Sequence, residues 1–597
     1  MALRQPVLAW PRSLVPLALA LALAGCQQPQ TRSQAPEETE PREKDGELRT
    51  IGDISTVANA EPVPVSGVGL VVGLEGTGGP APAGAYRTML EKHLAQKGVE
   101  HPKEVLASKN VSMVLVSAMI PAGAHKADPL DVEVVLPEGC HTTSLRGGYL
   151  QECLLYNYDS RADLSGKLNQ ANGNSAPQAV GDGLLLGHPL AQAEGPLLVG
   201  FGDKDENPDL RRARIWGGGR SRIERIFMIV LKEKFAQARI AEVVGERINR
   251  TFQGAYQGTL SDIATAKSAE VVYLHIPHQY KYNLLRYLRV VRLIPLQDAS
   301  PETAAYRQRL EKQLADPAHA VTAALRLEAL GKDSVDSLKP ALKSTSALVR
   351  FCAAEALAYL GDPACGEELA ELAVSRPALR AYCLSALASL DEAICHVKLQ
   401  ELEQLTPPTI RYGAFRALWA LDERDPAVQG ELLNDSFWLH RIAPDSPALV
   451  HLSTSRRAEV VLFGKEARMA PPFSLLAGDF TVTAAVGDER VTLSRFSTEH
   501  GVRRRQCSLR LEDVIRSMAE LGGAYPDVFE MIRQADRCGS LSCAVACDAL
   551  PQTVSTYALA SSGAGQHPEL LKKDEEIENA KDDFGGTPNL YDAGARH

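Results

Sequence analysis

Residues Gly67–Gly79, with the sequence GVGLVVGLEGTGG, contain six glycines in thirteen positions. Their spacing argues against a phosphate-binding loop. A P-loop needs a lysine after its last glycine, and a dinucleotide-binding loop needs G-x-G-x-x-G, whereas the first glycines here run G-x-G-x-x-x-G. The apolar run Gly69–Leu74 predicts a strand instead. We interpret the glycines as sites of tight turns and close backbone approach at the end of a strand, within one subunit or against a neighbouring one.

The N-terminus predicts a secretion signal. Leu14–Ala24 is apolar, follows two arginines and is too short to span a bilayer, and Leu23-Ala24-Gly25-Cys26 resembles the lipobox of bacterial lipoproteins. We expect residues 1–25 to be removed and Cys26 to be lipidated, with Gln27 favouring the outer membrane. An ordinary signal peptide with a chance cysteine is the alternative. Residues 26–49 have almost no apolar side chains and predict a disordered tether.

Composition narrows the classes of function. The chain is 45% hydrophobic with a formal net charge of -10, which is typical of a globular protein and argues against a nucleic-acid binder. It contains no G-x-S-x-G and no H-E-x-x-H, and its histidines are scattered. We therefore predict no catalytic site, no metal site and no cofactor.

Residues 50–297 have the mixed pattern of an α/β module. The predicted strands are Val68–Leu74, Ser112–Ala118, Asp131–Leu136, Tyr149–Tyr156, Arg225–Lys232 and Glu270–Ile276. The predicted helices are Tyr86–Lys97, Phe235–Thr251 and His278–Val290.

Residues 298–445 change in character and repeat. Four leucines recur at intervals of about thirty residues, a period that is typical of stacked helical repeats. They are Leu330, Leu360, Leu390 and Leu421. The segments AAEALAYLGD, CLSALASLDE and AFRALWALDE align with one another and resemble short HEAT-like repeats. Such a solenoid would serve either as a binding surface for an unknown protein partner or as a rigid spacer.

Residues 446–551 return to strands and then helices, and residues 552–597 become polar and charged, which predicts a disordered tail. Ala458–Phe463 and Phe480–Val486 are the predicted strands. Leu511–Leu521 and Tyr525–Gln534 are the predicted helices.

An ordered series of short motifs resembles the bacterial flagellar P-ring protein family. In chain order these are Ile51–Ile54, Gly67–Gly79, Ser108–Val111, Met119–Pro121, Asp131–Val134, Ser144–Gly148, Leu190–Gln192, Gly195–Leu197, Val199–Gly200, Phe235–Phe252 and Ala269–Ile276. The resemblance stops near Leu296 and resumes near Val460, with Phe473–Gly478 and Leu511–Leu541. It implies a multidomain α+β protein in which an all-α HEAT-like solenoid splits one P-ring-like module. We expect the two halves of the module to fold together as one body and the solenoid to bulge out between them.

The resemblance also implies a function. P-ring proteins form a closed ring in the periplasm, around the flagellar rod and at the peptidoglycan layer, so a homo-oligomer with rod and L-ring proteins as partners is expected. The candidate subunit contacts are Gly67, Gly69, Gly73, Gly76, Gly78, Lys109 and Asn110. Lipidation and the repeats depart from the family pattern. The alternative is therefore a non-flagellar envelope scaffold or adaptor whose repeats bind a partner.

The cysteines suggest disulfides. If Arg146-Gly147 were a two-residue hairpin turn, Cys140 and Cys153 would lie opposite each other within disulfide range, with two free thiols as the alternative. In P-ring proteins the cysteine matching Cys538 has an upstream partner, but Phe473 takes that place here. We expect one or two disulfides, rather than a metal site, among the late cysteines. These are Cys507, Cys538, Cys543 and Cys547.

A group of arginines surrounds Gly217-Gly218-Gly219. It forms either a solvated loop or a basic patch that meets an acidic neighbour. Its members are Arg211, Arg212, Arg214, Arg220 and Arg222.

Overall fold

The computed structural model describes most of the chain beyond its N-terminal tether. The described residues are 48–160, 178–180, 184–186, 188–200, 209–252, 255–256, 259–260, 262–297, 301–454, 457–497, 501–551, 555–561 and 590. The predicted signal peptide and lipidation site at Cys26 lie outside them. No helix within the described residues combines the length and apolarity that a bilayer crossing requires.

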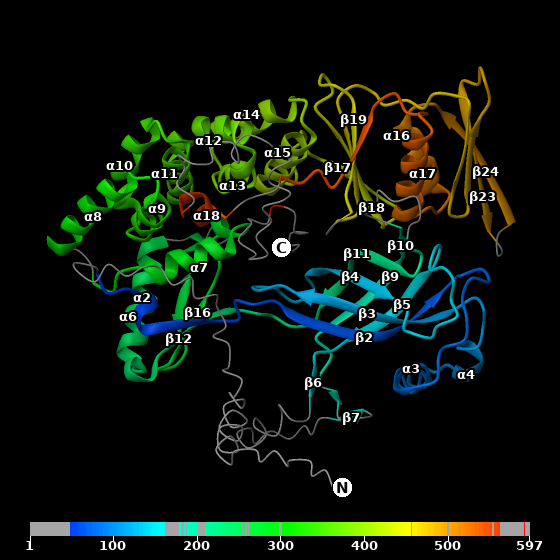
Figure 1. Ribbon diagram of the computed structural model, residues 1–597, viewed down its shortest axis with the longest axis horizontal. Coiled ribbons are helices and arrows are strands. Elements are labelled where there is room, and N and C mark those ends of the chain that lie inside the picture. The colour runs from blue at the N-terminus through cyan, green and yellow to red at the C-terminus, as the bar shows by residue number, and fades with distance from the viewer. Residues whose placement is uncertain are drawn as a thin grey trace, which may run out of the picture.

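The glycine-rich stretch belongs to a seven-stranded sheet in the lower part of Figure 1. Its strand order is β10-β11-β4-β3-β2-β5-β9, and β9 also pairs with β11, so the sheet closes on itself. The strands are β2 (Val63–Val72), β3 (Ser112–Ile120), β4 (Pro129–Val135), β5 (Tyr149–Leu155), β9 (Ala191–Pro196), β10 (Leu198–Val199) and β11 (Arg212–Ser221). Helices α3 (Ala85–Gln96) and α4 (Pro102–Val105) cover the outer side of β2 through Leu90, Leu94 and Leu106.

A second, four-stranded sheet lies beside the first and has the order β1-β12-β16-β15. Its strands are β1 (Ser55–Ala58), β12 (Phe227–Leu231), β15 (Ala264–Ala266) and β16 (Val271–Leu274). Strands β12 and β16 alternate buried and half-buried residues. The buried side chains of the amphipathic helices α6 (Ala238–Phe252) and α7 (Leu284–Leu293) belong to the same core as those of the strands. The predicted helix His278–Val290 begins as a short 3-10 turn, and α7 follows it.

An array of helices follows at the upper left of Figure 1. It comprises α8 (Pro301–Leu314), α9 (Ala320–Ala329), α10 (Val335–Leu338), α11 (Ala347–Leu360), α12 (Gly366–Ser375), α13 (Arg380–Leu387), α14 (Ala393–Glu403) and α15 (Pro408–Leu421). The four repeated leucines lie at or just after the ends of α9, α11, α13 and α15. The sequence period therefore corresponds to one pair of helices.

Two buried arginines at equivalent positions link successive helices of the array. Arg380, at the start of α13, donates from Nε to the carbonyl of Ala373 in α12 at 2.8 Å. Arg411, near the start of α15, donates from Nε to the carbonyl of Glu403 in α14 at 3.0 Å. The last turn of a helix leaves carbonyls without intrahelical donors, and these arginines satisfy one in each pair.

The chain ends in two more sheets with helices between them. The five-stranded sheet has the order β17-β18-β20-β19-β25 and the four-stranded sheet the order β21-β22-β23-β24. The strands are β17 (Gly430–Leu433), β18 (Phe437–Ile442), β19 (Leu449–Leu452), β20 (Glu459–Phe463), β21 (Phe473–Ala477), β22 (Phe480–Ala484), β23 (Arg490–Ser497), β24 (Gly501–Ser508) and β25 (Ala544–Cys547). Helices α16 (Leu511–Glu520) and α17 (Tyr525–Arg537) share one core with both sheets. Strands β17 and β18 fall inside residues 298–445, which were predicted to be helical.

The sequence suggested that the array would bulge out between two halves of one module, and the structure differs from this expectation. One continuous core runs from the small sheet and α7 through the array to one face of the five-stranded sheet. Contact between the early sheets and the late helices is limited: Leu198 of β10 and Trp216 of β11 join the core of α16 and α17, and Arg146 pairs with Glu530 at 3.3 Å. The early and late parts therefore meet directly at β10 and β11, and the helical array connects them as well.

Part of the predicted disordered tail has a defined place. Helix α18 (Thr556–Ser561) packs against the array, and the Arg289 guanidinium lies 5.2 Å from the centre of the Tyr557 ring. Leu590 is buried, and its carbonyl accepts a hydrogen bond from Nη2 of Arg416 at 3.3 Å. The prediction of disorder over 552–597 is thus wrong at these residues. The apolar side chains within this charged segment were the signal that the prediction overlooked.

Candidate assembly surface

Three of the six glycines face the interior of the subunit itself. A Cβ at Gly67 would lie 2.4 Å from the carbonyl oxygen of Leu154, and one at Gly69 would lie 2.8 Å from Cδ1 of Leu150. A Cβ at Gly78 would lie 2.4 Å from the carbonyl oxygen of Val111. These glycines permit close approach within one sheet. Their space is already filled by the same chain, which argues against their proposed role as contacts between subunits.

The remaining candidates form an exposed loop. Gly73 and Gly76 are exposed at φ of +79° and +88°, a conformation that favours glycine. Asn110 holds this loop, because its Oδ1 accepts from the amide of Gly76 at 3.1 Å and its carbonyl accepts from the amide of Leu74 at 3.0 Å. Lys109 beside it is exposed. The structure therefore brings Gly73, Gly76, Lys109 and Asn110 together as one surface, which we call the glycine loop.

The arginine-rich segment is a strand rather than a loop. Arg212 and Arg214 lie on the outer side of β11, while Ala213 and Ile215 point into the core. The pairing with β4 shifts between Ile215 and Gly219, so a bulge separates these arginines from Arg220 and Arg222. Arg211 donates from Nη1 to the carbonyl of Thr142 at 3.1 Å. The five arginines thus form two groups at the ends of β11 and not one patch.

The predicted bridge between Cys140 and Cys153 does not form. Cys153 pairs across the sheet with Ala193 of β9, and Cys140 lies in the loop after β4, where its thiol is 3.3 Å from the hydroxyl of Thr142. The assumed hairpin is absent because β5 pairs with β2 and β9 rather than with the segment before it. Both thiols are free and buried, and burial raises the pKa of Cys153 to about 12.

The late cysteines are also free, which corrects the expectation of one or two disulfides among them. Cys538 is exposed, whereas Cys507, Cys543 and Cys547 are partly buried. Burial raises the pKa of Cys543 to about 11. Within the described residues no group of three or more histidine, cysteine or acidic side chains has the arrangement of a metal site.

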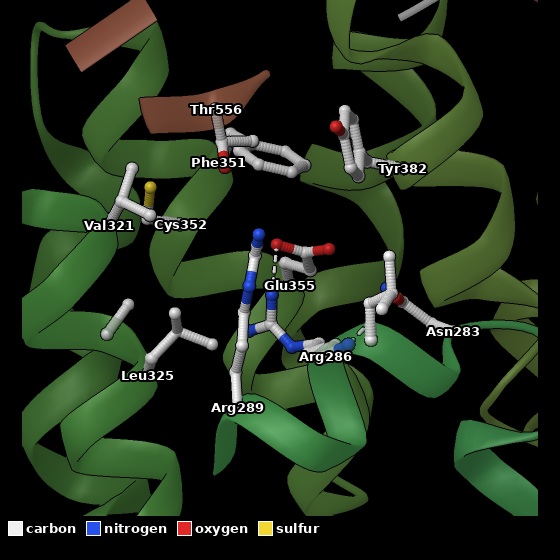
Figure 2. Close-up of a pocket in the computed structure, with 12 residues that line it drawn as sticks. Asn283, Arg286, Arg289, Val321, Leu325, Phe351, Cys352, Glu355, Tyr382 and Thr556 are labelled. Atoms are coloured by element: carbon white, nitrogen blue, oxygen red, sulfur yellow. Dashed lines mark hydrogen bonds and ion pairs between the residues drawn. The ribbon is translucent and has the colours of Figure 1, made fainter. Parts of the chain in front are cut away.

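The array is joined to the early part of the chain by a buried charge cluster of Arg286, Glu328, Glu355 and Tyr280, which we call the first joint. Figure 2 shows Arg286 beside Glu355. Arg286 of α7 donates from Nη2 to Oε2 of Glu328 on α9 at 2.6 Å and from Nη1 to Oε2 of Glu355 on α11 at 2.5 Å. Tyr280 donates its hydroxyl to Glu328 at 2.6 Å. The Arg286 guanidinium also lies 4.9 Å from the centre of the Tyr359 ring.

In the first joint two carboxylates share one ion-pair partner, Arg286, and Arg289 lies at the same cavity. Burial raises the pKa of Glu355 to about 7, against the lowering effect of Arg286 and with the help of Glu328. Burial likewise raises the pKa of Glu328, although Arg286 opposes it. Arg286 and Glu355 line a cavity of about 30 Å³, and Oε1 of Glu355 has no hydrogen-bond partner among the described residues. A cavity of this size suits one water molecule.

A second buried cluster, the second joint, attaches the array to the five-stranded sheet. Glu459 of β20 is fully buried and accepts a hydrogen bond from Tyr412 of α15 at 2.6 Å. Its Oε2 lies 3.1 Å from Nε of Arg457 and 3.7 Å from Nη1 of Arg416. Both guanidinium groups lie over Trp419, at 4.2 Å for Arg457 and 4.6 Å for Arg416. Such stacking suits the flat, weakly hydrated guanidinium group.

The second joint has the opposite balance of charge. Burial raises the pKa of Glu459, but Arg416 and Arg457 outweigh it and hold that pKa at about 2. Burial lowers the pKa of His440 to about 4 and that of His451 to about 3, although Glu459 opposes both shifts. His451 lies against Tyr412 with ring centres 3.6 Å apart. The residues of neither joint were singled out from the sequence. A single charged residue within an apolar run, such as Glu355 in CAAEALAYL, was the signal that could have indicated a buried charge.

The geometry provides a shaped, rigid body. An exposed, glycine-containing loop stands on a closed sheet, and two buried charge clusters fix the helical array at both ends. Breaking a buried pair costs several kcal/mol, so the joints restrict relative movement of the parts they connect. These features suit assembly with other molecules.

Comparison with known proteins agrees with this description. The family model described as "Flagellar P-ring protein" matches residues 50–169, the segment that contains the glycine loop. The model does not extend to the late sheets, so the predicted return of the resemblance near Val460 stays a prediction.

Several flagellar P-ring proteins are similar to this chain. That of Buchnera aphidicola is 35% identical over 102 residues, which are 17% of this chain and 27% of the relative. That of Thermotoga petrophila is 25% identical over 275 residues, which are 43% of this chain and 70% of the relative. That of Sodalis glossinidius is 36% identical over 134 residues, which are 22% of this chain and 36% of the relative. The first and third matches span less than half of the relative's length. Through residues 50–169, the chain is similar to the flagellar P-ring protein family.

Proposed function

We propose that the chain is a structural subunit of a ring in the flagellar basal body, assembled around the rod in the periplasm. The observation that carries the proposal is the family match over 50–169, which includes the glycine loop. A closed ring needs two different complementary faces on each subunit, so that a head-to-tail contact repeats until it closes. The glycine loop supplies part of one such face. The function requires no catalysis, no metal and no cofactor.

Rigidity supports this role. A bushing around a rotating rod must keep its shape, and the two joints hold the array to the small early sheet and to the five-stranded sheet around one continuous core. We propose that the array, which resembles HEAT-like repeats in sequence, is the part that meets a further protein partner. Rod, L-ring and peptidoglycan are the partners that the family relationship suggests.

The proposed location is the periplasm, with a lipid on Cys26 holding the chain to the outer membrane. The lipobox-like sequence at 23–26 supports this proposal, as does the polar stretch that follows it. Mass spectrometry of the purified N-terminal peptide tests it directly. A diacylglyceryl-modified Cys26 is the expected result, and an unmodified Cys26 in the mature chain would contradict it.

The second candidate function is an envelope scaffold without a flagellum. The array favours this candidate, because the helices of 301–421 lie outside the segment that the family model matches. Deletion of the gene separates the two functions. Loss of swimming in soft agar supports the flagellar role, whereas normal swimming with a defective envelope supports the scaffold.

Electron microscopy of the detergent-extracted, full-length protein tests the ring itself. Annular particles are the expected result, and a uniform population of monomers would contradict the proposal. Lys109→Glu reverses a charge beside the glycine loop and is expected to reduce the fraction of rings. Lys103→Glu makes the same charge change at another exposed lysine on the neighbouring helix α4, and is expected to leave ring formation unchanged.

A further inference from the structure

The two edge strands of the sheet β21-β22-β23-β24 differ in how their outer edges are covered. At β21, the side chain of Gln534 from α17 closes the edge: the amide of Leu476 donates to Oε1 of Gln534 at 3.0 Å, and Nε2 of Gln534 donates to the carbonyl of Leu476 at 2.5 Å. The side-chain amide thus takes the place of a neighbouring strand. Proteins protect sheet edges in such ways because unpaired backbone groups attract other strands.

Strand β24 has no comparable side-chain cap among the described residues, although the strand also contacts α16. It pairs with β23 over the whole of 501–508, and no described strand lies on its other side. Gly501–Gln506 are all exposed, on both faces of the strand. Figure 1 shows β24 at the margin of the molecule, on the opposite side from the helical array. The strand is long enough to pair with an incoming segment of average strand length.

This open edge carries a concentration of positive charge. Arg503, Arg504 and Arg505 are consecutive, so Arg503 and Arg505 lie on one face and Arg504 on the other. Arg503 stands directly across from Arg495 of β23, and like charges in that position destabilise a sheet. Arg505 pairs with Glu520, whereas Arg503 and Arg504 form no ion pair with a described residue. An anion beside β24 would relieve the repulsion.

The arrangement discriminates between occupants. Two copies of this edge would bring arginines face to face, which opposes self-pairing. A membrane surface would favour a largely apolar set of side chains here, but Phe496 and Val502 are separated in the sequence by polar residues that include Thr498, Glu499 and His500. An extended peptide with acidic side chains fits both features, because its backbone can pair with the edge and its carboxylates can lie beside the arginines.

We propose that β24 binds an extended acidic segment of a partner protein as the fifth strand of this sheet. The apolar pair Phe496 and Val502, 50% and 54% exposed and opposite each other near the end of β23 and the start of β24, supplies a contact for one non-polar residue of that segment. Backbone pairing gives affinity without strict sequence, and the arginines select for charge.

Fluorescence anisotropy with the full-length protein in detergent tests the proposal. The probe is a labelled octapeptide of alternating glutamate with threonine or valine, which places its carboxylates on one face. Saturable binding is expected, and the same peptide with lysine for glutamate is expected not to bind. In a third peptide every second backbone amide is N-methylated. This peptide keeps every charge but loses half of its backbone hydrogen-bond donors. It is expected to bind at least about tenfold more weakly.

Variants locate the site. Arg503→Glu with Arg504→Glu is expected to weaken binding of the acidic peptide by at least about tenfold, while Arg239→Glu with Arg424→Glu, an equal charge change at exposed arginines elsewhere, leaves it unchanged. Circular dichroism confirms that both variants fold. Equal binding of the N-methylated peptide would overturn strand addition. Equal loss in both variants would overturn the assignment to β24, and arginine-dependent binding to phosphatidylglycerol vesicles without peptide binding would point to a membrane instead.

Discussion

The two joints of the helical array use similar parts in opposite proportions. The first places two carboxylates, Glu328 and Glu355, around one arginine. The second places two arginines, Arg416 and Arg457, around one carboxylate. In each, a tyrosine hydroxyl donates to a carboxylate at 2.6 Å. Both joints are buried, so neither can rely on bulk solvent to balance its charge.

This difference in charge balance indicates which joint is more sensitive to the loss of a charged partner. A carboxylate that loses its partner can become neutral by binding a proton, and the raised pKa values of Glu355 and Glu328 show how near the first joint is to doing so. A guanidinium group has no such escape, because it stays charged throughout the physiological range. The second joint therefore depends more strictly on its single acid.

The largest effect is expected for Glu459→Gln. The change leaves Arg416 and Arg457 buried without a counter-charge, and loss of one member of a buried pair costs about 3–5 kcal/mol. We expect the urea midpoint of the transition reported by α15 and the five-stranded sheet to fall accordingly. Trp419 and Trp438 lie beside Arg457 and provide a fluorescence signal at this joint. Glu371→Gln, at an exposed position of the array, is the control and should change the midpoint little.

A smaller, pH-dependent loss is expected for Arg286→Met at the first joint. At pH 8 the variant buries two carboxylates without the cation that pairs with both of them, at a cost of about 3 kcal/mol. At pH 5 both carboxylates can bind protons, so the loss should shrink. Adding Glu328→Gln and Glu355→Gln should restore part of the stability at pH 8. A loss that is equal at the two pH values would contradict this account of the joint.

In the protein without substitutions, the stability of the two joints should change with pH in opposite directions. The pKa of Glu355 is raised from 4.5 to about 7, so the folded state binds the proton more tightly and its stabilising effect is lost as pH rises between these values. The pKa values of His440 and His451 are lowered from 6.5 to about 4 and about 3, so the unfolded state binds protons that the folded state does not. The second joint should therefore weaken as pH falls below about 6.5.

Hydrogen exchange, corrected for the intrinsic effect of pH, can follow the two joints separately. Between pH 7.5 and pH 5, peptides from α9 and α11 should become better protected and peptides from β18 to β20 less protected. Glu355→Gln should flatten the first response and His451→Phe the second. Parallel changes at both joints would show that the charge balance does not govern them.

The sequence predicted local structure well and contacts between distant segments poorly. Alternation placed β3, β4, β5 and β20 within a residue or two, and the thirty-residue period marked the helical pairs. Strand β11 was missed because the bulge near Gly217 interrupts its alternation and its outward residues are arginines. The joints were missed because Arg286, Glu328 and Glu355 are far apart in the chain, and only folding reveals that each solitary charge meets the others.

The finest distinction between the joints concerns their tyrosines. Tyr280→Phe and Tyr412→Phe each remove one hydroxyl that donates to a buried carboxylate, and a hydrogen bond to a charged group contributes about 1.5–3 kcal/mol. When Tyr280 is lost, Glu328 can bind a proton and become neutral, so that it no longer needs a donor for its charge. The free-energy cost of Tyr280→Phe should therefore be smaller at pH 5 than at pH 8. Glu459 remains ionised at both pH values because the arginines hold its pKa at about 2. The cost of Tyr412→Phe should therefore stay constant across this range, and a pH-dependent cost there would remove the contrast between the joints.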